Sequence, residues 1–225
     1  MDIHKPKPVH NLREFLSEIV VIVIGVLIAL GLEQVVENLH WQHEVTQGRE
    51  HLRDEIAFNE RVYGYRVAIA PCVSANLASL KKVVAALRAG ERVAPIAEFS
   101  SPNNGPIQHE IWNSLGAAQV QVHFPKDELH QYSMFYQYRQ DAEYFMDRES
   151  RAWRQLHALE GDPNRLSMPE LNALWVALGD AAEMTDALGY VVRRQVAIGR
   201  RLGIDPPQTY DTKADCRPIL GKTGS

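Results

Sequence analysis

The chain has 225 residues, of which 45% are hydrophobic and 23% charged, with a net charge of −4 at pH 7. This length allows one folded domain and an appended segment, and the content of Cys, Gly and Pro is too low for a disulfide scaffold or a disordered chain. The charge is spread along the chain without a concentrated basic face, so we expect no nucleic acid partner.

The first predicted element is an apolar segment near the N-terminus. In "EIVVIVIGVLIALGLEQ", fourteen residues without a polar side chain lie between Glu18 and Glu33. As a helix they rise about 21 Å, less than the roughly 30 Å of a bilayer core. Residues 15–36 are long enough if both glutamates lie in the headgroup layers or face a partner helix. We therefore predict a transmembrane helix over 15–36, after a cytoplasmic N-terminus of residues 1–14.

Two alternatives compete with this anchor. A cleavable signal peptide would use "ALG" at residues 29–31 as a small-x-small site, but the preceding region is long and contains Glu14 and Glu18. A buried core helix would be amphipathic, whereas this segment is apolar on all faces. An uncleaved anchor accounts best for both observations.

Flanking basic residues predict the orientation. Lys5, Lys7 and Arg13 precede the segment, whereas the next eighteen residues after Leu32 contain only Arg49. Basic residues favour the cytoplasmic side. The sequence thus predicts a bacterial inner-membrane protein with a cytoplasmic N-terminus and a periplasmic domain.

One face of the predicted anchor combines polar ends with small residues. At 100° per residue this helix-association face comprises Glu18, Ile22, Gly25, Ala29 and Glu33. Gly25 and Ala29 form a small-x-x-x-small pair, which allows close helix approach in lipid. We expect a homo-oligomer or a complex with another membrane protein, although small residues are also common in membrane helices that do not associate.

Beyond the anchor, the pattern predicts a helical periplasmic domain over 37–203. Val45, Leu52, Ile56, Tyr63 and Val67 recur at helical spacing. Pro71 is expected to stop this helix, and a second one is predicted from about 74 to 89. The proline-rich "ERVAPIAEFSSPNNGP" that follows is predicted to be the longest loop, either mobile or partner-binding.

The remainder of the domain is also predicted to be mainly helical. "IQHEIWNSLGAA" indicates a short helix, "QVQVHF" a brief extended segment, and residues 125–159 a long helix rich in aromatic residues. Ser167 and Glu170 form a capping box around Pro169, which opens a last helix running to Gly203. With an irregular tail over 204–225, the expected fold is all-α: a transmembrane helix continuing into an antiparallel helical bundle.

Two stretches, "REFLSEIVVIVIGVLIALGLEQ" in the anchor and "IWNSLGAAQVQVHFPKDELHQYSMFYQYRQ" further on, carry motifs that can be compared with a known family. They resemble an uncharacterised bacterial family of small single-pass membrane proteins with a helical domain of unknown function. The anchor motif is matched by Glu18, Ile19, Val23, Gly25, Ile28 and Ala29, and the later motifs by Trp112, Leu115, Leu129 and Tyr136. Gly116 and Ala117 replace the usual small polar pair, and "VQVHF" replaces the usual turn. The resemblance implies location and fold type and carries no activity with it.

Few residues in the sequence suggest a disulfide, a metal site or a catalytic site. Cys72 and Cys216 could form a disulfide outside the cytoplasm. His40 and His43, spaced i,i+3, could hold a metal, but a juxtamembrane helix is usually polar, so we expect no metal site. No catalytic or cofactor-binding motif is recognisable, and no cofactor is expected.

Two further clusters have simple structural explanations. The aromatic run "YSMFYQYRQDAEYF" could line a ligand cleft, but aromatic residues at helical spacing more often form a core. The arginines at 193, 194, 200 and 201 could touch anionic lipid or cell-wall polymer, although basic residues near a helix end usually complement the helix dipole.

These features predict a membrane-anchored periplasmic interaction or accessory protein whose partners are the bilayer and another protein chain. A ligand-sensing module is the first alternative. A periplasmic enzyme with a site assembled only in space is the second.

Overall fold

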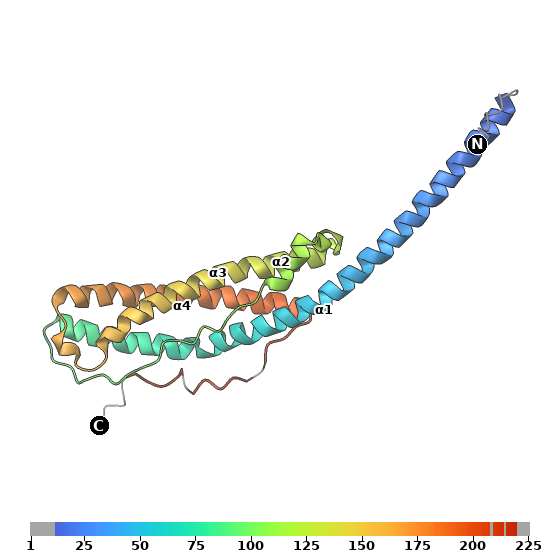
Figure 1. Ribbon diagram of the computed structural model, residues 1–225. Coiled ribbons are helices and arrows are strands. Elements are labelled where there is room, and N and C mark those ends of the chain that lie inside the picture. The colour runs from blue at the N-terminus through green and yellow to red at the C-terminus, as the bar shows by residue number, and fades with distance from the viewer. Residues whose placement is uncertain (1–11, 208, 214, 220–225) are drawn as a thin grey trace, which may run out of the picture. The chain divides into compact units, whose positions relative to one another are not determined.

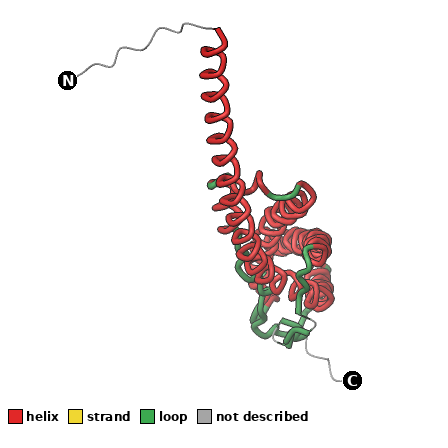
Figure 2. The backbone as a smooth tube through the Cα atoms, turned by 90° about the vertical axis from the view of Figure 1, so that its right-hand side faces the viewer, coloured by secondary structure: helices red, strands yellow, loops and turns green. Residues whose placement is uncertain are grey.

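A computed structural model describes residues 12–219 except 208 and 214, without the side chain of residue 14. Helices and loops make up these residues, and no strand occurs among them (Figure 2). The prediction of an all-α fold is confirmed. The helices are α1 (Leu12–Arg88), α2 (Glu110–Ala117), α3 (Lys126–Leu156) and α4 (Met168–Arg201), with three short 3-10 turns at Val120–His123, His157–Leu159 and Pro163–Arg165.

The chain forms two compact units that meet between Gln47 and Gly48. The first unit contains the N-terminal part of α1, and the second contains the rest of α1 and all later elements, which we call the helical domain. The large hydrophobic side chains of residues 19–36 are all at least 40% exposed. This part of α1 is long and apolar enough to cross a membrane, with a mean hydropathy of 2.8 over its best window.

In the helical domain, α1 passes through Pro71 without ending. The expected stop at Pro71 and separate second helix are therefore wrong. A proline inside a helix removes one backbone hydrogen bond and costs about 3 kcal/mol. Ile69 and Val73 on either side of it are buried, so packing on the domain core offsets this cost.

The long helices do not simply alternate in direction. Arg49 pairs with Glu128 and Arg66 with Glu149, so α1 and α3 run parallel. The long loop after α1 makes this possible because it returns along the length of the domain before α2 begins (Figure 1). α4 runs antiparallel to α3, since Thr185 contacts Glu149 while Gln195 contacts residue 135.

The core lies where these three long helices meet. It contains leucines from α1 and α4 together with the fully buried Trp153 of α3. Figure 1 shows the three helices side by side within the domain, with the C-terminal tail running along α1. Within residues 119–124, expected to be extended, Val120–His123 form a 3-10 turn instead. The described part of the chain offers them no strand to pair with, so a local turn satisfies their backbone groups.

The last helix begins as the sequence predicts. The Glu170 carboxylate accepts hydrogen bonds from the Ser167 backbone N–H (2.7 Å) and hydroxyl (2.6 Å). These bonds, with that of the Ser167 side chain to the first turn, complete the capping box. The helix ends before Gly203, whose φ of 73° favours glycine.

Candidate functional site

The helical domain contains an open groove of about 380 Å³ that three segments form. We call it the α1 groove. Four lining residues share one face of α1, two come from the long loop and three from the tail: Phe58, Arg61, Val62, Tyr65, Asn103, Gly105, Pro207, Thr209 and Tyr210. The lining is largely apolar and includes one charged residue, Arg61. A groove of this size and character can bind a small organic ligand.

A glycine on α1 lets the tail form one wall of this groove. A Cβ at residue 64 would overlap the hydroxyl of Tyr210 and lie 3.1 Å from Pro206. The ring of Tyr210 meets the ring of Tyr65 edge to face, with their centroids 6.0 Å apart. Gly64 is thus required for the tail to lie directly against the backbone of α1.

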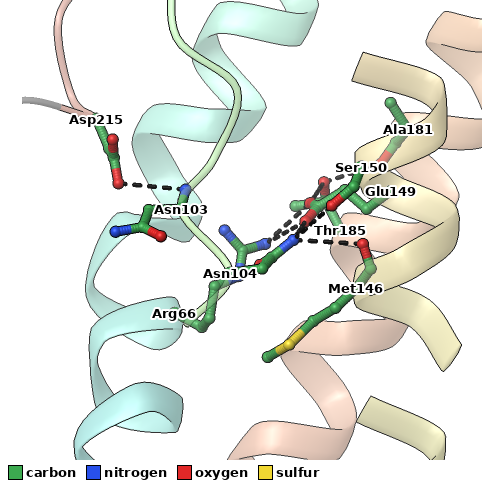
Figure 3. A network of polar contacts seen from close by, with 9 residues as sticks. All are labelled: Arg66, Asn103, Asn104, Met146, Glu149, Ser150, Ala181, Thr185 and Asp215. Carbon is green, nitrogen blue, oxygen red and sulfur yellow. Dashed lines mark hydrogen bonds and ion pairs between the residues drawn. The ribbon is translucent and has the colours of Figure 1, made fainter. Parts of the chain in front are cut away.

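The tail is also fixed by covalent and polar links. Cys72 and Cys216 are joined by a disulfide, with their Cα atoms 5.0 Å apart. The Tyr65 hydroxyl donates to Asp215 (2.6 Å), and the Asn103 backbone N–H donates to the same carboxylate (3.3 Å; Figure 3). Asp215 therefore connects α1, the long loop and the tail at the edge of the groove.

A buried ion pair lies on the α1 turn that carries Tyr65. Arg66 Nη2 donates to both carboxylate oxygens of Glu149, at 2.9 and 3.0 Å. Thr185 of α4 donates to the same carboxylate at 2.7 Å, and Asn104 of the long loop at 3.3 Å (Figure 3). This single carboxylate thus joins α1, α3, α4 and the long loop. We call this group of hydrogen bonds the Arg66–Glu149 clamp.

The long loop is held at further points along its length. Asn59 exchanges two 2.8 Å hydrogen bonds with the backbone of Gln108. Glu160 accepts from the backbone N–H of Phe99, and Ile96 forms a β-bridge with Gly161. These contacts bind the loop to α1 and to the connection between α3 and α4.

Another buried carboxylate positions α2. Glu55 accepts a hydrogen bond from the Tyr136 hydroxyl, together with bonds from the backbone N–H groups of Ile111 (2.8 Å) and Trp112 (3.4 Å). The Trp112 and Tyr136 rings stack with their centroids 4.9 Å apart. Negative charge at a helix N-terminus is favourable, so Glu55 stabilises the start of α2.

Glu60 differs from the other two buried carboxyls. Its side chain is fully buried, and neither oxygen has a hydrogen-bond partner among the described residues. Removal from water raises the pKa of Glu60 to about 8, which outweighs the opposing effect of Arg200. Gly199 makes room for it, because a Cβ there would lie 2.5 Å from Glu60 Oε1.

The phenols that line the groove do not supply a base. Burial, followed by the hydrogen bond to Asp215, raises the pKa of Tyr65 to about 12. Burial also raises the pKa of Tyr210. Both hydroxyls stay protonated at neutral pH. The Tyr65 hydroxyl donates to Asp215, whereas the Tyr210 hydroxyl has no hydrogen-bond partner among the described residues.

The residues singled out from the sequence are distributed over both units. The helix-association face lies on the first unit, where Ile22 is 64% exposed and a Cβ at Gly25 would meet no atom within 4 Å. Its role in association stays a prediction. Within residues 12–219 as described, no three His, Cys, Asp or Glu side chains gather to hold a metal, and this includes His40 and His43.

The aromatic run at the start of α3 is mainly core. Tyr132, Phe135 and Tyr136 are all buried and pack edge to face or stacked with rings of neighbouring elements. The groove obtains its aromatic lining from Phe58, Tyr65 and Tyr210 instead.

Sequence reasoning missed the buried carboxyls, although a signal was present. Glu60 lies four residues after Ile56 and three before Tyr63, inside the apolar stripe of the predicted helix. A charged residue in such a stripe is either paired inside the core or has a shifted pKa. Which of these applies depends on partners far away in sequence.

Comparison with protein-family models, curated proteins and solved structures finds no match.

Proposed function

We propose that this chain is a single-pass protein of the bacterial inner membrane whose helical domain lies in the periplasm and serves as an interaction or accessory component. The observation that carries the proposal is the exposed apolar part of α1. Every large hydrophobic side chain over residues 19–36 is exposed, and burying such a surface in water-free surroundings is strongly favourable. A bilayer supplies those surroundings.

Two further features support the orientation. Arg13 precedes the apolar segment together with Lys5 and Lys7, which lie outside the described residues, and basic flanks favour the cytoplasmic side. The Cys72–Cys216 bond belongs to the helical domain, and disulfides persist in oxidising compartments such as the periplasm.

Membrane extraction tests the anchoring. After cell breakage, the full-length protein should sediment with membranes, resist an alkaline carbonate wash and dissolve in detergent. Replacing Ile24 and Leu27 with Arg should release it, because each charge at the bilayer centre costs about 2.5–3.5 kcal/mol. Recovery of the wild-type protein in the aqueous fraction would refute the proposal.

Self-association through the helix-association face can be tested separately. Gly25→Leu should weaken crosslinking between copies in intact membranes, because a large side chain keeps two backbones apart. Gly31→Leu is the matched control, since Gly31 lies on the opposite side of the helix and is equally open. If both variants crosslink as the wild type does, this face is not the interface.

Ligand sensing is the second candidate, and the α1 groove is the observation that favours it. In a thermal-shift screen of the full-length protein in detergent, small aromatic carboxylates should raise the unfolding temperature, because Arg61 is the only charge in an aromatic lining. Val62→Trp would fill the groove and should abolish the shift. A flat response by the wild-type protein would count against this candidate.

A further inference from the structure

A smaller depression of about 110 Å³ lies between α3 and α4, away from the residues that form the α1 groove. We call it the α3–α4 pocket. Its lining combines polar or cationic side chains with apolar ones. The polar or cationic ones include His130, Tyr138, Arg194 and Arg201, and the apolar ones include Met134 and Ile198. Pockets for drug-sized ligands begin near about 300 Å³, so this volume suits a group of only a few heavy atoms.

Helical spacing brings these residues together. His130, Met134 and Tyr138 follow one another at intervals of four on α3, so they share one face. Arg194 and Arg201 are seven residues apart on α4, two turns along one face. The helices are antiparallel, with Gln195 bonded to the carbonyl of residue 135, so Arg194 is level with the Tyr138 end and Arg201 with the His130 end.

The charges in this pocket are not neutralised. Arg200, one residue away from Arg201, pairs with Asp205 at 3.3 Å, and Arg139 on α3 pairs with Glu143 at 2.6 Å. Among the described residues, neither Arg194 nor Arg201 has an acidic partner within 4 Å, and no carboxylate lines the pocket. Two guanidinium groups thus border one depression without a counter-charge.

The helix dipole accounts for only one of the two arginines. Arg201 lies in the last turn of α4, where a cation is favourable. Arg194 lies two turns earlier, and the dipole effect falls off within the last turn. Its guanidinium rests over the ring of Tyr190 at 5.3 Å, a contact that brings no negative charge to it.

From this arrangement we infer that the α3–α4 pocket binds a phosphate-type oxyanion. Arginine presents paired N–H donors that match the oxygens of a phosphate, and two arginines can hold such a group from both sides. The Tyr138 hydroxyl and the His130 ring add donors. The phosphate can belong to free inorganic phosphate or to the headgroup of an anionic lipid, and binding of the free anion does not depend on membrane anchoring.

Calorimetric titration of the full-length protein in neutral detergent tests the site with sodium phosphate, at an ionic strength held constant with sodium chloride. The wild-type protein should bind one phosphate per chain. Arg194→Ala and, separately, Arg201→Gln should each weaken binding at least tenfold. Arg193→Ala is the matched control, because Arg193 is a neighbouring exposed arginine outside the pocket, and it should bind within twofold of the wild type.

A parallel arm identifies the source of the phosphate. The same variants are placed in nanodiscs of phosphatidylglycerol or of phosphatidylcholine, and the unfolding temperature of the helical domain is measured. Stabilisation by phosphatidylglycerol that disappears in Arg194→Ala but remains in Arg193→Ala would assign the site to a lipid headgroup. Binding in the calorimeter alone would assign it to the free anion.

Two results overturn the inference. One is a wild-type protein that responds to neither probe. The other is a response that Arg193→Ala reduces as much as Arg194→Ala does, because this would indicate general attraction to a basic surface. Circular dichroism of each variant verifies its helix content, and the second arginine variant keeps the test valid if the first does not fold.

Discussion

The two parts of α1 contain similar apolar residues in opposite surroundings. In the first unit Val21 is 69% exposed and Leu27 62% exposed, whereas in the helical domain Leu52 and Leu80 are completely buried. The two parts differ in their pattern of polar residues. In the domain part, charged residues recur beside an apolar stripe and make the helix amphipathic, whereas residues 19–32 have no polar face. A helix that is apolar all round needs an apolar surrounding from outside the chain, whereas an amphipathic one can be buried by its own domain.

Polar groups deepen this contrast. The domain part of α1 places Glu55, Asn59, Glu60 and Arg66 in the interior, and all but Glu60 have partners in other segments. The first part presents only an apolar surface between Glu18 and Glu33. Four predictions sharpen this comparison, from the largest expected effect to the smallest.

Removing the buried ion pair should have the largest effect. Arg66→Ala leaves Glu149 buried without its cation, so the free energy of unfolding of the helical domain should fall by about 3–5 kcal/mol. Arg151→Ala is the control, because it breaks an exposed pair with Asp147 and should cost less than about 1 kcal/mol. Denaturant unfolding in detergent, followed by tryptophan fluorescence, measures both. If Arg66→Ala and Arg151→Ala lower the free energy of unfolding equally, the buried pair of Arg66 and Glu149 does not stabilise the domain more than an exposed pair does.

Equivalent truncations in the two parts of α1 should have unequal consequences. Leu80→Ala leaves a cavity in the core and should lower the unfolding free energy of the domain by about 2–5 kcal/mol. Leu27→Ala removes a side chain that makes no part of that core, so the same measurement should not change. Domain destabilisation by Leu27→Ala would contradict the division into two units.

Loss of the disulfide should loosen the tail. Replacing Cys72 and Cys216 with Ser should lower the unfolding free energy by about 2–4 kcal/mol, because the bond closes a loop with a sequence separation of 144. Reduction of the wild-type protein should have the same effect. Protein isolated from membranes under thiol blocking should run differently on non-reducing and reducing gels; identical mobility would show that the bond does not form in the cell.

Glu60 should give stability an unusual pH dependence. Because its pKa is raised from 4.5 to about 8 in the folded state, the folded protein holds this proton more tightly than the unfolded chain does. Its contribution to stability is complete below pH 4.5 and is lost as pH rises to about 8. Glu60→Gln should therefore flatten the decrease in unfolding free energy between pH 5 and 8, and should leave the stability near pH 4.5 almost unchanged. If the unfolding free energy of Glu60→Gln depends on pH as steeply as that of the wild type, the Glu60 carboxyl is hydrated in the folded protein and its pKa is not raised.

Much of the fold follows from local sequence signals. The capping box at Ser167 and Glu170 and the apolar periodicity of α3 and α4 lie within a few residues of one another, so they identify elements directly. Pro71 misleads because its local effect is offset by the buried neighbours Ile69 and Val73, which depend on tertiary packing. The alternation in residues 119–124 misleads because no strand occurs among the described residues with which this segment could pair.

The candidate sites could not be predicted in the same way. The α1 groove joins residues near 60, 104 and 210, and the clamp joins Arg66 to a glutamate 83 positions later. The parallel path of α1 and α3, produced by the return of the long loop, sets these pairings, and no local pattern encodes it. The α3–α4 pocket requires the register of two antiparallel helices, although the grouping of arginines near the end of α4 is visible in the sequence.

A reporter that is active on only one side of the membrane tests the central claim most directly. Alkaline phosphatase, which needs the oxidising periplasm to fold, is fused after residue 225, and a fluorescent protein that matures in the cytoplasm is fused at the same place in a second strain. The proposed topology predicts an active phosphatase, a dark fluorescent fusion, and both products in the membrane fraction. A fluorescent fusion with an inactive phosphatase would contradict it.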